Sequence, residues 1–501
     1  MERSAKWIQL GKAILLGLVL TVFAAGLGLY LGNLVISPQW QDAIRLAGLG
    51  SVVVAILVNP ALGLMLWIIL EPFTRFWFLS IRLPPGIPDL SLGRLSVGLL
   101  TAVWLAQLAS GKRRMRRLSL VEISMAAFCI MALPSVMAGM GGFSRSGQQM
   151  FDRFIAPFLA FILAKNLYDK KTGLDRLGAM LTVIGLYLSF MVFYEQITGQ
   201  PLFYLFGRTT AYSRSLRKIV SLLGNPAFLG TVLGMVVPFA LYKFVRERSM
   251  AKLLYGLLFA VAALGNFLCF NRGAWLALAM ALLLMMVFAR EYRRYLLPVI
   301  LIAAIIGVLR WQAISESPLV TERLINVSGV RFRLTMLEAS QKMIREHLLF
   351  GVGFENFGYY YLLYGGHWET LAYDVPTPHN SYLLVFTTMG LVCFIPYVLI
   401  FLSMFVQIGT MLRRAGRDTR IDKALLVAGW AVIAVYTVSA ASVDLFINFF
   451  TSLVFFVIMG TIMGYVSQLR SSAPLTAPVP GGAAGPWPSG SVPSSLPEAR
   501  P

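Results

Sequence analysis

Long apolar runs, separated by short polar segments, recur along the whole chain. Each run has roughly the 17–25 residues that an α-helix needs to cross the hydrocarbon core of a bilayer. Because only Asn59-Pro60 separates the second run from the third, these two could form one broken or re-entrant pair. The sequence therefore predicts an all-α, polytopic membrane helix bundle with about 12–14 transmembrane helices. The spans lie at 13–32, 43–58, 61–78, 93–109, 119–139, 154–168, 177–197, 222–242, 253–270, 274–289, 295–312, 381–408, 424–441 and 446–467.

The composition excludes a water-soluble protein. Hydrophobic residues make up 58% of the 501 residues and charged residues only 13%, whereas a soluble domain carries about 25% charged residues. A net charge of +21 would suggest nucleic-acid binding in a soluble protein, but most Lys and Arg here lie in short loops between apolar runs. We therefore expect the lipid bilayer as a partner, and no nucleic acid. The three cysteines lie within apolar runs, which indicates packing rather than disulfides or metal binding.

The basic loops predict the orientation of the bundle. If the N-terminus lies inside, every strongly basic short loop falls on the cytoplasmic side, where positively charged loops generally lie. Both ends of the chain are then cytoplasmic. Residues 1–470 form the predicted transmembrane domain, and the Pro-rich residues 471–501 are expected to be a disordered tail. The basic loops are 112–117, 165–176, 243–252, 290–294 and 413–423.

Four segments fall on the outer side: 140–153, 198–221, 271–273 and the long loop 313–380. They contain many arginines, against the usual charge bias. Either these arginines pair with glutamates of the long loop, or they bind an anionic ligand at the outer face. The arginines are Arg145, Arg153, Arg208, Arg214, Arg217, Arg272, Arg323, Arg331 and Arg333.

The long outer loop contains a predicted amphipathic helix over residues 331–348. We expect this helix to lie on the outer membrane surface, with its apolar stripe toward the lipid. Arg331 and Arg333 stand at its start, where cations oppose the helix dipole, so an anion would stabilise them. The aromatic residues over 354–368 are typical of a membrane belt and also suit stacking on sugar rings. The apolar stripe, at helical spacing, consists of Leu334, Leu337, Ile344 and Leu348.

A Pro-x-Pro-His-Asn-Ser segment, residues 376–381, ends the loop where the next span begins. His379 is therefore predicted at the outer membrane face. Gly390 follows after about three helical turns, so the two would share a helix face and let a neighbouring helix approach closely beneath the histidine. A lone interfacial histidine is often structural, but the proline clamp and the outer arginines favour a functional one. Asp444, near the outer end of the last helix, either orients His379 or an arginine or is a structural carboxylate.

Three segments resemble the O-antigen ligase and polymerase superfamily, a group of multi-pass bacterial glycosyltransferases. Residues 272–275 are similar to that family's Arg-Gly-Ala-Trp element at a helix end. Residues 333–337 fit its Arg-x3-Leu pattern, and His379 with Gly390 fits its His-x10-Gly pattern. The resemblance covers roughly residues 220–410.

The resemblance implies glycan transfer from undecaprenyl diphosphate to a glycan, lipid or surface-protein acceptor, at the outer face of the bacterial cytoplasmic membrane. By analogy, Arg272 and Arg333 bind the diphosphate, where arginines stabilise developing negative charge, and Arg331 or Arg217 assists. His379 is the expected general base for the acceptor hydroxyl. No Asp-x-Asp pair occurs, so we expect neither a metal nor a cofactor. Arg272, Arg333 and His379 should then converge at one outer cavity.

Several functions remain open at this stage. The motifs do not separate a ligase from a repeat-unit polymerase or from an enzyme that glycosylates proteins. A flippase for a lipid-linked sugar would be expected to show related halves and charges that line its central helices. Here the polar residues gather on one outer face, which favours an enzyme. A membrane protein with no chemistry would tolerate replacement of Arg272, Arg333 and His379.

Overall fold

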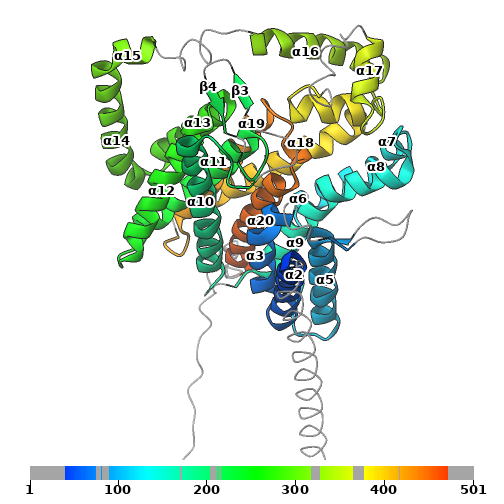
Figure 1. The fold of residues 1–501 in the computed structure, drawn as a ribbon. Helices are drawn as coiled ribbons and strands as arrows, with labels where there is room; N and C mark the ends of the chain where they lie inside the picture. Colours follow the sequence, from blue (N-terminus) through cyan, green and yellow to red (C-terminus); the bar gives the residue numbers. More distant parts are fainter. Residues whose placement is uncertain are drawn as a thin grey trace, which may run out of the picture.

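The computed structural model describes residues 40–74, 80–81, 90–169, 172–203, 211–213, 216–219, 221–316, 328–364, 377–416 and 418–471. The predicted first span, residues 365–376 of the long loop and the tail from residue 472 lie outside the described residues. Nearly all described elements are helices (Figure 1), which confirms the expected helical bundle. Two short antiparallel hairpins accompany them, β1 (Ser80–Ile81) with β2 (Leu90–Ser91) and β3 (Ala211–Ser213) with β4 (Leu216–Lys218).

The helices follow one another with short connections. They are α2 (Trp40–Val58), α3 (Pro60–Leu70), α5 (Leu92–Ala109), α6 (Leu120–Met131), α7 (Leu133–Met137), α8 (Gly142–Met150), α9 (Ala156–Leu167), α10 (Gly173–Thr198), α11 (Pro226–Arg246), α12 (Ala251–Leu268), α13 (Arg272–Phe288), α14 (Arg290–Leu309), α15 (Trp311–Ser315), α16 (Ser328–Glu346), α17 (Phe357–Leu363), α18 (Ser381–Ala415), α19 (Lys423–Ala440) and α20 (Phe449–Ser471). Short turns η1 (Glu71–Phe73) and η5 (Leu445–Ile447) and a π-helical turn η2 (Phe151–Ile155) connect some of them.

Asparagines begin four of these helices. Each of their side-chain oxygens accepts a hydrogen bond from a backbone N–H of the following first turn, which would otherwise have no partner inside the helix. Two of the four are followed by proline at the first helical position, where the missing N–H is not needed. The capping residues are Asn59 for α3, Asn225 for α11, Asn271 for α13 and Asn380 for α18.

Nine helical spans in the described part of the chain are long and apolar enough to cross a membrane. These are α5, the α6–α7 stretch, α10, α11, α12, α14, α18, α19 and α20. Residues 47–58, 60–73 and 272–288 form shorter apolar helices. The second and third predicted spans are broken at Asn59-Pro60, and Gly63 lets the two helices pack closely, since a Cβ there would lie 2.4 Å from Ile56 Cγ1.

The bundle is built around α11 and α20. Buried residues make up 83% of the apolar window of α11 and 89% of that of α20, but only 11% of that of α14 at the edge. α20 packs along α9, and α11 along α12 and α19. Both central helices are apolar on all sides, as expected for helices that protein surrounds. The loops at their ends are therefore held in fixed places.

α18 is broken inside the bundle, at Gly390. This residue has φ 74° and ψ −178°, a backbone conformation that only glycine adopts readily. The segment 348–353, which follows α16, docks into the break. Val352 N–H and Gly353 N–H donate to the carbonyls of Thr387 and Thr388, at 2.9 and 3.0 Å.

The backbone after the break is also hydrogen-bonded to this segment. Leu391 N–H donates to the Leu348 carbonyl at 2.9 Å, and Val392 N–H donates to the Leu349 carbonyl at 3.3 Å. Irregular backbone at membrane depth is tolerated only where such partners exist. The expectation that His379 and Gly390 share a helix face is therefore wrong. The close approach expected at Gly390 does occur, but a loop backbone, not a helix, makes it.

The predicted amphipathic helix is α16, which begins three residues earlier than expected (Figure 1). It packs against α17 and α18. The buried face is formed by Met336, Ala339 and Met343. The predicted stripe lies elsewhere, because Leu334 and Leu337 are exposed. That the stripe contacts lipid stays a prediction.

Candidate functional site

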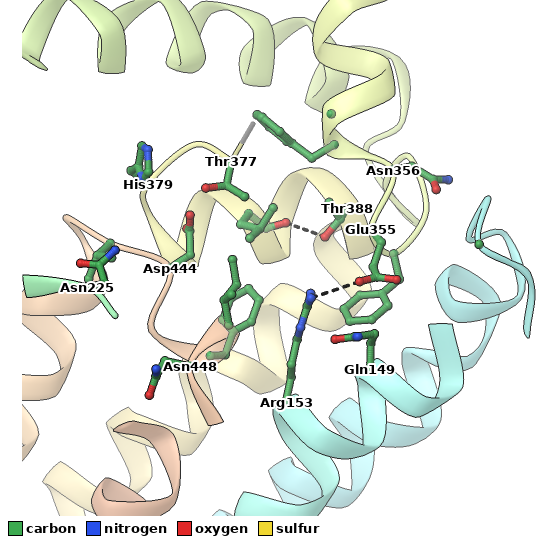
Figure 2. A pocket seen from close by; sticks show the side chains of 18 of the residues that line it. Gln149, Arg153, Asn225, Glu355, Asn356, Thr377, His379, Thr388, Asp444 and Asn448 are labelled. Carbon is green, nitrogen blue, oxygen red and sulfur yellow. Dashed lines mark hydrogen bonds and ion pairs between the residues drawn. The ribbon is translucent and has the colours of Figure 1, made fainter. Parts of the chain in front are cut away.

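A cavity of about 700 Å³ opens at the end of the bundle where α18 and α20 begin (Figure 2). His379, Thr377 and Asp444 lie at one side of it, and Arg153, Glu355 and Gln149 at the other. Its walls come from α8, the start of α11 and the loops 354–359, 377–379 and 443–448. Segments far apart in the sequence thus form one polar chamber.

His379 lies just before α18 in a constrained turn. Its φ of 48° is unusual for a residue with a side chain and persists only where the surroundings fix it. Asn380 fixes it, because its side chain accepts hydrogen bonds from the backbone N–H groups of Tyr382 and Leu383 at 3.0 and 3.1 Å. The imidazole therefore lies next to the helix N-terminus, at one side of the chamber (Figure 2).

Ser381 holds the Asp444 loop beneath this turn. Its hydroxyl donates to the Val443 carbonyl and accepts from Leu445 N–H, both at 2.9 Å, so it binds the chain on both sides of Asp444. A single serine thus places the predicted aspartate beside the predicted histidine.

The Asp444 side chain is nearly inaccessible, since the residue is 2% exposed. The Thr377 hydroxyl and the backbone N–H groups of His379 and Asn380 face its carboxyl group. Burial raises the pKa of Asp444, and these groups together with the His379 charge oppose that rise only in part.

Arg333 and Arg272 both approach the loop that carries Asp444. Arg333 Nη2 donates to the Ser442 carbonyl at 3.2 Å. Arg272 opens α13, and the next residue, Gly273, lies directly against Ser442, because a Cβ there would be 1.9 Å from Ser442 Oγ. The loop that carries Asp444 therefore contacts both arginine-bearing elements.

The two guanidinium groups act on each other electrostatically. Burial and the Arg272 charge lower the pKa of Arg333, and the Asp444 charge raises it. Neighbouring like charges of this kind are stabilised when an anion binds between them. Arginine presents paired N–H donors that match phosphate oxygens, so the arrangement can hold a phosphate group.

For two predicted site residues, only the backbone is described. Arg331 lies in α16 and Arg217 in β4, where its backbone pairs with Tyr212 of β3. Their side chains lie outside the described residues. Their assisting role stays a prediction.

Arg153 and Glu355 belong to the cavity; Arg153 was among the outer arginines expected either to pair with glutamates of the long loop or to bind an anion, and its ion pair with Glu355 fits the first alternative. Arg153 lies in the π-helical turn η2, its Nη2 is 3.1 Å from Glu355 Oε1, and its guanidinium lies 5.6 Å from the centre of the Phe354 ring. Glu355 has φ 65°, so a second constrained residue faces the chamber. The sequence shows Arg153 among the outer arginines, but it gives no signal for a partner 202 positions away.

Asn356 fixes the loop that carries Glu355. Its amide nitrogen donates to the carbonyls of Ala138 and Val352, and its oxygen accepts from Met140 N–H. Within the described residues, no group of three or more His, Cys, Asp and Glu side chains could hold a metal ion. Metal independence itself stays a prediction.

One family model matches part of the chain. Residues 257–398 match the family model described as O-antigen ligase. Arg272, Arg333 and His379 all lie within the match, whereas Arg217 and Asp444 lie outside it. A search of curated proteins gave no match to the chain. The family match supports the predicted resemblance to the O-antigen ligase superfamily over residues 257–398, and the nine apolar helical spans in the described residues agree with a multi-pass membrane protein.

Proposed function

We propose that the protein transfers a glycan from undecaprenyl diphosphate to an acceptor hydroxyl at the outer face of the bacterial cytoplasmic membrane. The observation that carries this proposal is the order of charged groups around one loop. Arg333 binds the Ser442 carbonyl and interacts with the charges of Arg272 and Asp444, while Asp444 and His379 both line the cavity. The proposed groups that bind the diphosphate and the proposed group that removes the proton thus adjoin the same loop.

The arginine pair is the proposed site of the donor diphosphate. Guanidinium groups bind phosphate oxygens through two parallel hydrogen bonds and stay charged at any working pH. Arg331 and Arg217 are proposed to assist. As the glycosidic bond breaks, negative charge grows on the diphosphate, and fixed cations at that position stabilise the transition state more than the ground state.

The cavity is the proposed site of the acceptor. Its amide side chains, Gln149, Asn225 and Asn448, both donate and accept hydrogen bonds, as sugar hydroxyl groups require. Phe357 and Tyr359 also line it and offer aromatic faces for sugar rings. An uncharged glycan suits this mixture better than a charged one, because the arginines and carboxylates that line the cavity are balanced in number.

The proposed reaction is a direct displacement. The acceptor oxygen forms a bond to the anomeric carbon, and the bond from that carbon to the diphosphate oxygen breaks. The electron pair stays on the diphosphate, which Arg272 and Arg333 bind. The acceptor proton passes to the His379 imidazole, and the buried Asp444 carboxylate stabilises the resulting positive charge.

The alternative functions differ from this proposal in the acceptor or in the fate of the donor. A repeat-unit polymerase or a protein O-oligosaccharyltransferase would use the same groups with another acceptor. A flippase for a lipid-linked sugar would move the donor across the bilayer without breaking its glycosidic bond.

The test is glycan transfer in proteoliposomes that contain the lipid-diphosphate donor and candidate acceptors. His379→Ala should lower the transfer rate roughly 10²–10⁴-fold, the usual loss for a general base. His347→Ala is the matched control, because His347 lies at the end of α16, next to Tyr360 and away from the cavity lining. Transfer that survives in His379→Ala would refute the assignment of the base. Movement of donor without transfer in the wild type would favour the flippase.

A further inference from the structure

A second polar cavity, of about 550 Å³, lies at the opposite end of the bundle. Asn448 lines the first cavity and Gln468 the second, and α20 runs between them. These residues are about 20 positions apart, so the cavities are separated by roughly 30 Å along the helix, close to the thickness of the hydrocarbon core. The second cavity therefore lies at the opposite membrane surface, among segments predicted to be cytoplasmic.

Three cations line this second cavity: Lys112, Arg113 and Arg176. One carboxylate, Asp169, lines it as well and accepts a hydrogen bond from the Thr172 hydroxyl at 3.2 Å. The positive charge thus exceeds the negative charge. A general preference for basic cytoplasmic loops explains the presence of lysines and arginines, but it does not explain why separate loops close around a common space.

Hydrogen bonds hold one wall of the cavity in place. Arg113 donates to Gln107 Oε1 at 2.8 Å and to the Asn166 carbonyl at 3.4 Å. Arg116, which lies behind this wall, donates to the Tyr168 carbonyl at 2.8 Å and also to the Gly464 carbonyl. These two arginines therefore cap the C-terminal end of α9, because they bind its last carbonyls, and they hold the loop that carries Lys112 in place.

In the part of the chain that the structure describes, the side chains of Lys112 and Arg176 make no such hydrogen bonds. Among the described residues, no carboxylate pairs with either side chain, and Arg176 is half-buried in the cavity wall. At the rim, Val58 is 79% exposed, which gives an apolar surface next to the cationic space. Free cations beside an exposed apolar side chain, at the level where membrane helices end, match a phosphate headgroup with acyl chains attached.

We infer that this cavity binds the phosphate group of an anionic phospholipid through Lys112 and Arg176. The site lies about one membrane thickness from the proposed catalytic centre and does not depend on the proposed reaction. Occupation would join the loop after α5, which carries Lys112, to α10, which carries Arg176. Inorganic phosphate offers the same chemistry without the acyl chains, so it serves as the competing ligand in the test.

The test uses the full chain in nanodiscs of phosphatidylcholine with or without phosphatidylglycerol. Native mass spectrometry counts the phosphatidylglycerol molecules that stay bound. Lys112→Gln with Arg176→Gln should lower the apparent affinity at least roughly tenfold, since each cation near a headgroup contributes to lipid binding. Arg413→Gln with Arg414→Gln removes the same charge from the exposed last turn of α18, outside the cavity, and should change the affinity less than about threefold.

Each outcome is informative. Lys112→Arg with Arg176→Lys keeps both charges and should retain binding, which separates charge loss from misfolding. Equal losses in the cavity variant and the control variant would show that only general surface charge attracts the lipid, and would overturn the site. Binding of inorganic phosphate without retention of phosphatidylglycerol would overturn the lipid as the ligand.

Discussion

Replacing Gly390 tests whether the break in α18 is a required part of the fold. In Gly390→Ala, the new Cβ would lie 2.1 Å from the Leu349 carbonyl oxygen and 2.5 Å from Phe350 N. Both neighbours are backbone atoms, so no side chain can rotate away. The glycine conformation alone costs roughly 1–3 kcal/mol for an alanine. Displacement of the docked segment also loses the bonds from Leu391 and Val392, worth about 0.5–1.5 kcal/mol each.

The expected loss in the free energy of unfolding is therefore roughly 2–6 kcal/mol. Thermal unfolding of the purified protein in detergent, followed by intrinsic fluorescence, measures it. Gly98→Ala in α5 is the matched control, because a Cβ there has no neighbour within 4 Å. In a helix interior this change should stabilise by about 0.5–1 kcal/mol. Equal melting temperatures for the two variants would refute the idea that the break needs glycine.

Three further variants probe the charged groups. Asp444→Asn should raise stability at neutral pH, because burial raises the pKa of this carboxyl group and so disfavours its charged form. In melting curves this gain should vanish below about pH 4, where the carboxyl group is protonated in the unfolded chain as well. A gain that does not depend on pH would contradict this cause. Arg333→Lys keeps the charge but loses two-point phosphate binding, so the transfer rate should fall about 10–100-fold, whereas Arg345→Lys in the same helix should have little effect. Lys165→Met leaves Glu122 buried without its ion-pair partner and should lower the free energy of unfolding by about 3–5 kcal/mol, as measured by denaturant titration. Adding Glu122→Leu removes the unpaired carboxylate and should restore most of that loss.

Local signals made parts of the site predictable from the sequence. The proline-rich segment before His379 and the capping residue Asn380 define the start of α18, because both act within a few residues. The Arg272 turn is equally local, since Asn271 caps α13 directly. The family resemblance then assigned roles to these positions, and those roles await the transfer assay.

Contacts between distant segments were not predictable. Arg153 and Glu355 pair across 202 positions, and Ser381 binds the Asp444 loop across 62 and 64. Nothing in the periodicity of either segment encodes these partners. Gly390 was recognised as a place of close approach, but a single glycine in an apolar helix usually leaves the helix intact. The break arises because a distant loop supplies hydrogen bonds that the helix itself gives up.

The apolar stripe of α16 shows a different limit. Helical spacing places the predicted leucines and Ile344 on one stripe, but it does not say whether protein or lipid covers that stripe. The structure packs Met336 and Met343 inward and leaves Leu334 exposed. Because sulfur-containing side chains fill irregular space well, the methionines suit the contact with the broken helix.

The docking of residues 348–356 into α18 also constrains the order in which the protein can mature. This segment binds Ser135 and Ala138 at the end of α6–α7, which are synthesised long before it, and Thr387 and Leu391, which are synthesised after it. Until α18 has entered the membrane, the N–H groups of Val352 and Gly353 and the carbonyls of Leu348 and Leu349 lack their partners. Assembly of the chamber must therefore wait for nearly the whole chain, and such long-range closure is intrinsically slow. A nascent chain that stops before residue 381 would carry every upstream helix and still have no chamber.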